Sequence, residues 1–577
     1  MNKLKPLPEE WSGLLNNEQK EAIENINGPL LIIAGAGSGK TRVLTYRYAH
    51  LIKTYGINFE NVLAITFTNK AANEMKDRIS DLLNLELSPK WISTFHSLCV
   101  KMLRIHGHLI GFNNNFTIYD QSDSTKLVRN CMRDSDIDTK QYSPKRIQAH
   151  ISSLKNQRIL PGEAVEFAQS FFDVKVAEIY SSYQKKLMLA NSMDFDDLLI
   201  KAVELLETSD KSLNYWSSKF QYIMIDEYQD TNMVQYRLVE LLASKHKNIC
   251  VVGDSDQSIY AFRGADIRNI EEFESDFKDA KVISLEKNYR SSQKILDIAN
   301  AVISNNPRKK DKKLWTDNDE GLDVNLVEFN SERDESRWIA EQINKLLEDK
   351  AFTEIAIFYR TNNQSRLFEE ELRKLSLSYK VVGNVRFYDR KEIKDILAYL
   401  NYLINPEDTV SFERILNVPK RGIGESTLQK LRDYANKNEI SLSKSIENLD
   451  EINNLSDRVK KQINNFKEII NDLKSFALQG PSETISKTLE LTGYKDELVK
   501  EGTLDSQMRL ENLDELLTSA FEFENLYEED IEDPFTVLRD YLESIALFTD
   551  SDDVDKEDRI LLMTLHNAKG LEFPVVF

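Results

Sequence analysis

The chain has 577 residues, of which 41% are hydrophobic and 29% charged, and this is typical of a soluble globular protein with about four domains of roughly 150 residues. The N-terminus "MNKLKPLPEEW" lacks the apolar core of a secretory signal, and no apolar run reaches the ~20 residues of a membrane span, so we expect a cytoplasmic protein without a membrane partner. The net charge of -20 argues by itself against nucleic acid, but much of the acidity lies late, in 522–535 and 549–558, as solvated faces or linkers.

Short apolar runs separated by helical patterns recur along the chain. The first set is "PLLIIA", "NVLAITF", "KWIST", "YIMIDE", "NICVVGD" and "KVISLEKNYR". A second set is "VNLVEF", "EIAIFYR", "YKVVG", "RILLMTLH" and "PVVF". Strands that alternate with helices predict an α/β fold, here with two parallel sheets that carry helices on both faces. Two stretches with helical periodicity, about 112–192 and 386–550, interrupt the alternation and are expected to be helical insertions.

The first strand leads into a glycine-rich stretch followed by an amphipathic helix. This stretch matches a phosphate-binding loop, with Ala34 where the usual pattern has glycine. Small residues let backbone N–H groups surround phosphate oxygens, Lys40 would reach the β and γ phosphates, and Thr41 would bind Mg²⁺. The alternative is a chance glycine-rich turn. The candidate nucleotide-binding loop is Ala34, Gly35, Ala36, Gly37, Ser38, Gly39, Lys40 and Thr41.

A pair of carboxylates follows another buried strand, in "QYIMIDEYQDTN". Parallel sheets present ligand sites at the carboxyl ends of their strands. Asp226 is therefore expected to hold Mg²⁺, and Glu227 to orient and deprotonate a water that attacks ATP. The alternative is an acidic pair at a strand end that faces solvent.

With these motifs in place, the chain resembles the superfamily 1 DNA helicases of the UvrD/PcrA/Rep group over nearly its whole length. The matching segments are "LNNEQKEAI", "AGAGSGKT", "ITFTNKAANEMKDRI", "STFHSL", "IDEYQDTN", "VVGDSDQSIYAFRGA", "LEKNYRSS", "FYRTNNQSR", "PKRGIG" and "TLHNAKGLEFPVVF". The resemblance implies two RecA-like P-loop domains, each interrupted by a helical insertion. The implied divisions are 1–111 and 193–283 for the first domain, 112–192 for its insertion, 284–385 and 551–577 for the second domain, and 386–550 for its insertion.

The resemblance also assigns residues to ATP. Gln19 would contact the adenine edge, although Asn16 and Gln19 also have the spacing of a helix capping box. Arg42 and Tyr289 would sandwich the adenine ring. Gln257 and Arg290 would sense the γ phosphate, with a surface salt bridge as the alternative for Arg290. Glu572 would hydrogen-bond the ribose.

A further set of residues would contact DNA. Aromatic side chains stack bases without regard to sequence, and the resemblance gives this role to Phe67, Tyr260 and Phe262; many relatives have tryptophan at the last position, and any of these rings could instead belong to a core. Contacts to the DNA backbone or sugars are implied for Thr94, His96, Arg263, Arg360, Asn362, Thr564 and His566. Lys420 and Arg421, beside two glycines, resemble a segment that grips duplex DNA, or form an ordinary basic loop before a helix.

Motifs and resemblance together therefore predict an ATP- and Mg²⁺-dependent DNA helicase or single-strand translocase of bacterial repair and replication. Its 3′ to 5′ polarity is implied by the resemblance alone. Its partners would be single-stranded DNA, junctions with duplex DNA, and repair proteins. The alternatives are a helicase subunit of a recombination nuclease complex and a DNA-binding ATPase that does not translocate. Because family members continue past "GLEFPVVF", we also expect a C-terminally truncated fragment, poor in DNA-stimulated hydrolysis.

Overall fold

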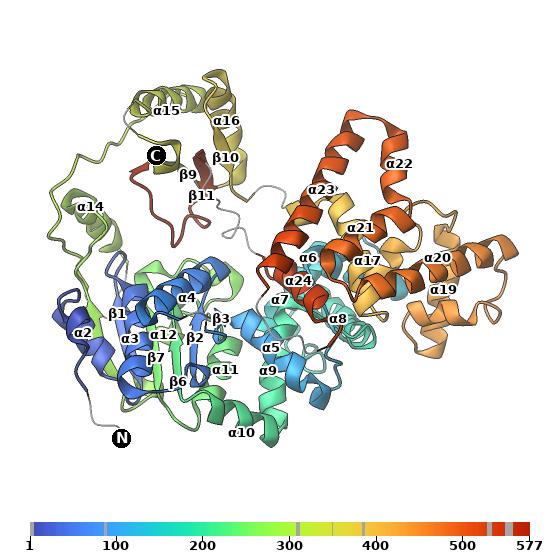
Figure 1. The fold of residues 1–577 in the computed structure, drawn as a ribbon, viewed down its shortest axis with the longest axis horizontal. Coiled ribbons are helices and arrows are strands. Elements are labelled where there is room, and N and C mark those ends of the chain that lie inside the picture. Colours follow the sequence, from blue (N-terminus) through green and yellow to red (C-terminus); the bar gives the residue numbers. More distant parts are fainter. Residues whose placement is uncertain are drawn as a thin grey trace. The chain divides into compact units, whose positions relative to one another are not determined.

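The computed structural model divides the chain into two compact units, each assembled from separate stretches of sequence. The first comprises Met1–Leu98, Leu206–Asn384 and Thr549–Phe577, and the second Cys99–Leu205 and Val385–Phe548. The structure describes residues 5–85, 89–306, 312–348, 350–383, 387–527, 533–548 and 558–577. None of the helices in these ranges is long and apolar enough to span a membrane. Figure 1 shows both units as a ribbon that is coloured along the sequence from blue at the N-terminus to red at the C-terminus.

The first unit contains a six-stranded, fully parallel sheet in the order β3-β2-β6-β7-β1-β8. Its strands carry the first set of apolar runs. In chain order they are β1 (Leu30–Ala34), β2 (Val62–Thr66), β3 (Ile92–Thr94), β6 (Tyr222–Ile225), β7 (Ile249–Gly253) and β8 (Lys281–Leu285). Because helices cover such a sheet, its strands are continuous apolar runs, and the residues of β2, β6 and β7 are all buried.

Helices α2 (Asn17–Glu24), α3 (Lys40–Tyr55) and α4 (Asn69–Leu83) pack on one face of this sheet. The sheet contributes alternate residues to their common core, such as Leu30 and Ile32 from β1, as the two-residue period of a strand requires. The other helices before residue 284 in this unit are α1 (Glu9–Ser12), α10 (Asp210–Lys219), α11 (Met233–Ala243), α12 (Arg268–Glu271) and α13 (Phe273–Asp276).

A second parallel sheet in the same unit has the order β10-β11-β9-β12. Helices α15 and α16 pack on one face, and residues from 565–574 on the other. The elements of this part are α14 (Gln293–Ile303), α15 (Glu332–Leu346), β9 (Ile355–Tyr359), α16 (Ser365–Lys374), β10 (Tyr379–Val381), β11 (Ile560–Thr564) and β12 (Val575–Val576).

The prediction of a strand in "VNLVEF" is wrong. Residues 324–329 have no ladder partner, and Leu326 is 99% exposed. Alternating apolar residues give a segment β propensity, but a strand forms only where a neighbouring strand supplies hydrogen bonds and a packed face.

The second unit is mainly helical, in agreement with the predicted periodicity. Its first stretch holds α6 (Gln121–Asp134), α7 (Pro144–Asn156), α8 (Phe171–Leu189) and the short parallel pair β4 (Thr117–Tyr119) and β5 (Ser192–Asp194), while the division between the units falls within α5 (Phe95–His106) and α9 (Phe195–Thr208). Its second stretch holds α17 (Lys391–Ile404), α18 (Thr409–Ile415), α19 (Glu425–Asn438), α20 (Asp457–Phe476), α21 (Pro481–Leu491), α22 (Tyr494–Glu501), α23 (Leu504–Asn525) and α24 (Thr536–Ala546).

The two stretches of the second unit share buried contacts. Val410, in α18, belongs to the core formed by α6, α7 and α8. The buried Asn405 amide donates to the backbone carbonyl oxygens of Ala190 and Asn191 at 2.9 and 3.0 Å, and to the Thr117 hydroxyl at 3.0 Å. The first helical stretch therefore completes its packing with residues more than 200 positions later in the chain.

Candidate functional site

The phosphate-binding loop lies where β1 gives way to α3. Gly37 and Gly39 have φ of +65° and +88°, a left-handed conformation that favours glycine. Gly39 caps the N-terminus of α3, which begins at Lys40. The buried Ser38 hydroxyl donates to the Gly35 carbonyl at 2.8 Å and closes the turn. The loop thus presents backbone N–H groups at a helix N-terminus, an arrangement suited to anionic ligands.

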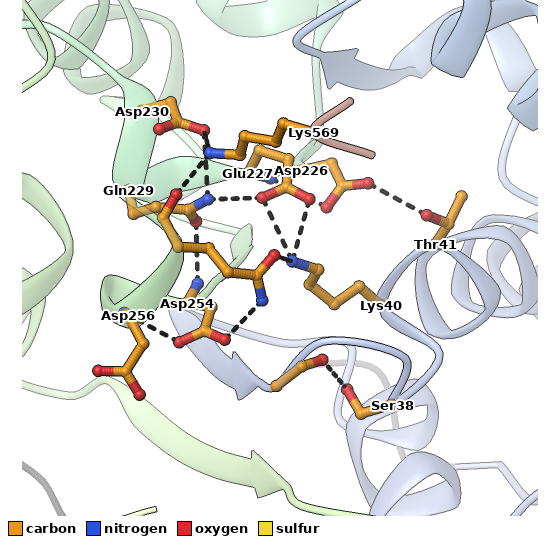
Figure 2. A network of polar contacts seen from close by, with 12 residues as sticks. Ser38, Lys40, Thr41, Asp226, Glu227, Gln229, Asp230, Asp254, Asp256 and Lys569 are labelled. Atoms are coloured by element: carbon orange, nitrogen blue, oxygen red, sulfur yellow. Dashed lines mark hydrogen bonds and ion pairs between the residues drawn. The ribbon is translucent and has the colours of Figure 1, made fainter. Parts of the chain in front are cut away.

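Lys40 and Thr41 meet the carboxylates that follow β6 (Figure 2). The Lys40 ammonium lies 3.0 and 3.2 Å from the two carboxylate oxygens of Glu227, and 3.1 Å from the Gln257 amide oxygen. The Thr41 hydroxyl donates to the Asp226 carboxylate at 3.3 Å. β1 and β6 are separated in the sheet only by β7, so their carboxyl ends bring together residues 185 positions apart.

Burial and neighbouring charges shift the pKa values of Asp226 and Glu227 in opposite directions. Burial, with the charge of Glu227, raises the pKa of Asp226 to about 6. Burial opposes ionisation of Glu227 as well, but the Lys40 ammonium and a hydrogen bond from Gln229 outweigh it and lower its pKa. Glu227 is therefore ionised at neutral pH and can accept a proton once its contact with Lys40 is exchanged.

The backbone at Glu227 is strained. Its φ of +50° and ψ of 42° lie in the left-handed region, which costs a residue other than glycine about 1 to 3 kcal/mol. Strain of this kind persists where the surrounding structure fixes a residue, commonly at functional sites. Here it turns the side chain from the end of β6 toward Lys40.

Two side chains without a predicted role hold this group in place. The Gln229 amide donates to Glu227 at 2.5 Å, and its oxygen accepts the Asp254 N–H at 2.9 Å. The Asp254 carboxylate accepts from the Gln257 amide at 2.6 Å and forms an ion pair with the buried Lys312. Gln229 and Asp254 lie within motifs that match the family, so the sequence could have indicated a role for them at this site. The sequence around Lys312 contains no such motif.

Cationic side chains from the later part of the first unit also reach this site. Lys569 forms an ion pair with Asp230 and donates to the Gln257 carbonyl oxygen at 2.7 Å (Figure 2). The sequence analysis assigned Lys569 no role, although it lies within a matching segment. Arg290 forms an ion pair with Glu572, so the structure brings these two predicted residues together.

The residues predicted for adenine have partners of their own. Gln19 forms the complete capping box with Asn16, and its amide also donates to the Ser38 carbonyl at 3.1 Å. The Arg42 guanidinium lies over the Tyr46 ring, 5.7 Å from the centroid. Tyr289 is 43% exposed, and its hydroxyl accepts from the Asn16 amide at 3.1 Å. The capping interpretation of Gln19 is therefore confirmed, and Gln19 also joins α2 to the phosphate loop.

Two family models account for almost the entire chain. The UvrD/REP helicase N-terminal domain matches residues 15–278, and the UvrD-like helicase C-terminal domain matches residues 283–577. The chain belongs to the UvrD/REP helicase family. It is similar to the ATP-dependent DNA helicase PcrA of Staphylococcus aureus strain Mu50 and of Staphylococcus epidermidis strain ATCC 12228, with 46% identity over 98% of this chain and 77% of each relative. These matches leave the expectation of a truncated fragment unsupported.

In this UvrD/REP family member, the predicted aromatic residues form one cluster. The Phe67 and Tyr260 rings stack with centroids 5.2 Å apart and an angle of 13° between their planes. Tyr260 is buried and donates to the His566 carbonyl at 3.1 Å. Phe262 is 66% exposed and contacts the edge of the His566 ring. Phe262 is thus the exposed ring, while Tyr260 belongs partly to the core, as the alternative interpretation held.

The remaining residues predicted to contact DNA lie at or just after the ends of β3, β9 and β11, and in the segment that holds Arg263. The buried Thr94 hydroxyl bonds with Ser97, and burial lowers the pKa of His96 to about 4, so that this imidazole is neutral at physiological pH. Arg360 lies 3.5 Å from the His566 ring nitrogen, and the Asn362 amide donates to the Gly383 carbonyl. Thr564 ends β11. The Arg263 side chain is outside the part of the structure that is described.

Lys420 and Arg421 differ in orientation. Lys420 is exposed. The Arg421 guanidinium donates to the carbonyl oxygens of Ile415 and Val418 at 2.8 and 3.0 Å and to the Tyr399 hydroxyl at 2.6 Å. Arg421 therefore shapes its own loop, and the contact of both cations with duplex DNA stays a prediction.

Proposed function

We propose that this protein couples ATP hydrolysis at the phosphate-binding loop to 3′ to 5′ movement along single-stranded DNA and to the unwinding of duplexes ahead of it. Family membership makes the chain an ATP-driven DNA helicase. The observation that carries the chemical part is the contact of Lys40 with both Glu227 and Gln257 at the carboxyl edge of the first sheet. The polarity and a role in DNA repair rest on resemblance.

The chemistry follows from the positions of these side chains. Lys40 would exchange the Glu227 carboxylate for the β and γ phosphate oxygens when ATP binds. Glu227, freed from its cation, would then orient the attacking water and accept its proton. Gln257, which is held by Asp254, would contact the γ phosphate.

Thr41 and Asp226 fit a magnesium ion. Both offer oxygen atoms, the ligand type that Mg²⁺ prefers, and they lie 3.3 Å apart at the start of α3. Bound there, the ion would neutralise charge on the β and γ phosphates. Asp226 is therefore proposed to bind the metal, whose charge would keep this carboxylate ionised. Glu227 is already ionised at neutral pH, so it can accept a proton once Lys40 has moved to the phosphates.

The other nucleotide contacts are proposals that rest on the resemblance. Arg42 and Tyr289 would stack on adenine, and Gln19 would contact the adenine edge with the amide that now bonds Ser38. Arg290 would exchange Glu572 for the γ phosphate, and Glu572 would then reach the ribose. An arginine that arrives from the second sheet's part of the unit would link hydrolysis to closure of the site.

For DNA, we propose a single-strand track centred on Phe67, Tyr260 and Phe262, with the exposed Phe262 as its main stacking platform. The polar residues of the track would be Thr94, His96, Arg263, Arg360, Asn362, Thr564 and His566. Lys420 and Arg421 are the cations proposed to contact duplex DNA. We also propose that the six divisions given above are the two RecA-like domains and their insertions, and that the protein acts in the cytoplasm.

The test is the ATPase rate of the purified chain with and without single-stranded DNA, together with strand displacement on duplexes that carry either a 3′ or a 5′ tail. We expect stimulation by DNA and displacement on the 3′-tailed duplex alone. Hydrolysis without displacement would favour the ATPase that does not translocate, and unwinding of the 5′-tailed duplex would overturn the polarity.

A further inference from the structure

Asn288, next to the two predicted residues Tyr289 and Arg290, is a buried polar side chain without an assigned role. It is 2% exposed. Its backbone N–H donates a hydrogen bond to the Trp315 carbonyl at 2.7 Å, and its backbone carbonyl accepts one from the Thr316 hydroxyl at 2.8 Å. The side chain therefore starts from a fixed backbone and has little freedom to rotate away.

One end of this side chain contacts the phosphate loop. The Asn288 amide nitrogen donates to the Ala36 carbonyl oxygen at 2.6 Å. The next residue adds a parallel contact, because the Tyr289 N–H donates to the Gly37 carbonyl at 2.9 Å. The approach is close: a Cβ on Gly37 would come within 2.5 Å of the Asn288 amide nitrogen and 2.8 Å of the Arg290 Cβ. Glycine at position 37 is thus required by packing as well as by its positive φ.

The other end of the side chain fixes the backbone of Arg290. The Asn288 amide oxygen accepts the N–H groups of Arg290 and Ser291, both at 2.8 Å. This local turn determines where the Arg290 side chain starts. A single side-chain amide therefore joins two parts of the site that are about 250 residues apart in sequence, and it uses its donor and its acceptor for different ends.

We propose that Asn288 is a positioning residue for ATP hydrolysis, which fixes Arg290 relative to the phosphate-binding loop. This inference rests on the proposed function, since it assumes that ATP is hydrolysed at this loop with Arg290 at the γ phosphate. The Asn288 amide oxygen would raise turnover because it fixes the backbone of Arg290. The amide nitrogen would raise nucleotide affinity because it holds the phosphate-binding loop at Ala36. The two ends can therefore be separated by substitution.

The experiment compares Asn288→Ala, which removes both ends, with Asn288→Ser. A serine hydroxyl can still accept the local N–H groups but is too short to reach Ala36. Asn318→Ala is the matched control, because Asn318 is exposed and its amide donates to the Ser291 carbonyl rather than to the phosphate-binding loop. The measurements are kcat and KM for ATP, the Kd for ADP, the Kd for single-stranded DNA and the melting temperature.

We expect Asn288→Ala to lower kcat by about 10- to 100-fold, less than the 10³- to 10⁵-fold that loss of such an arginine can cost. Asn288→Ser should recover most of kcat but keep the weakened ADP affinity of Asn288→Ala. In an Arg290→Ala background, Asn288→Ala should have no further effect on kcat, because it acts through that residue. Asn318→Ala should match the wild type, and all variants should keep their DNA affinity.

Several outcomes would overturn the inference. One is a kcat for Asn288→Ala within twofold of the wild type, and another is an equal, additional loss of kcat in the Arg290→Ala background. A fall in melting temperature and DNA affinity in both Asn288 variants would make the residue purely structural. Failure of the proposed function is distinguishable, since the wild type would then lack DNA-stimulated hydrolysis or Arg290→Ala would hydrolyse ATP normally.

Discussion

The two parallel sheets of the first unit differ in size and in what they contribute. In the six-stranded sheet the inner strands β2, β6 and β7 are buried along their whole length, whereas the four-stranded sheet has only two inner strands, β9 and β11, between the partly buried edge strands β10 and β12. The first sheet places Lys40, Asp226 and Glu227 at the ends of its central strands. The second contributes Glu572 from the loop between its last strands, and Arg290 and Lys312 come from segments before it.

This difference shows how a nucleotide site can be divided between rigid and adjustable parts. The groups proposed to hold phosphates and activate water lie at the edge of a close-packed sheet, where displacement disturbs many contacts. The arginine proposed to respond to the γ phosphate, Arg290, lies in a partly exposed segment, which can shift at lower cost. Substitutions of Lys40 or Glu227 should therefore remove the chemistry, and substitution of Glu572, in the loop before the last strand of the second sheet, should tune it. Arg290, which precedes the second sheet, is the exception, because loss of such an arginine can cost about 10³- to 10⁵-fold in rate.

The strongest test of this contrast is Lys40→Ala. Removal of the ammonium eliminates its contacts with Glu227 and Gln257 and its charge at the phosphates, so kcat should fall by about 10³-fold. Single-strand DNA affinity should not change, because Lys40 has no contact with the aromatic cluster. Steady-state hydrolysis and fluorescence anisotropy with labelled DNA measure the two properties. Hydrolysis close to wild type would show that the site lies elsewhere.

Glu227→Gln isolates the water-activating step. The amide keeps the size of the side chain but cannot accept a proton, so turnover should fall by about 10²- to 10⁴-fold while ATP binding is retained. Equilibrium binding of a nucleotide analogue and single-turnover hydrolysis separate these effects. An equal loss of nucleotide affinity would make Glu227 a binding residue and would weaken the assignment of the base to the first sheet.

Phe262→Ala tests the place where the two parts meet, since this ring contacts His566. Loss of the exposed ring should weaken single-strand binding by about 1 to 3 kcal/mol with little dependence on base sequence. The melting temperature should stay the same, because the ring is largely exposed. Tyr260→Ala is the control, because it removes a buried ring and should lower the melting temperature. A lower melting temperature for Phe262→Ala without a change in DNA affinity would contradict the role in stacking.

The smallest effect is expected for Glu572→Ala, in the second part. Its ion pair with Arg290 is exposed, and such pairs contribute about 0 to 1 kcal/mol to stability. Loss of a ribose contact should raise KM for ATP a few-fold with little change in kcat. A loss of kcat as large as that of Glu227→Gln would show that the two parts do not divide the work in this way.

The sequence predicts the first sheet better than the second for a physical reason. Strands buried on both faces are continuous apolar runs, so β1, β2, β6 and β7 are evident from composition, and the glycines of the phosphate loop mark its turn. In "VNLVEF" apolar residues are interspersed with polar ones, as in a strand with one exposed face, but the segment has no ladder partner. Strand pairing needs two segments, so the sequence of one segment does not determine it.

Within the site, local chemistry was predictable and distant partners were not. The capping box of Asn16 and Gln19 is a pattern of four consecutive residues, and it forms. The inward orientation of Arg421 depends on carbonyl groups freed by its own loop, which composition does not specify. The pairing of Asn288 with Ala36 and of Lys312 with Asp254 depends on the tertiary fold. Asn288 lies within the matching segment "LEKNYRSS", but neither residue has a local pattern that identifies its partner.

The shared core of the second unit has a consequence for synthesis of the protein. Val410 completes the core of α6, α7 and α8, and Asn405 satisfies the carbonyl groups of Ala190 and Asn191. About 180 residues separate these two stretches, and a ribosome that adds about 5 to 20 residues per second needs roughly 10 to 40 s to make them. During that interval the nascent first stretch lacks Val410 and Asn405, so apolar surface and two backbone carbonyl groups that these residues cover stay exposed, and a chaperone that shields them would protect this stretch.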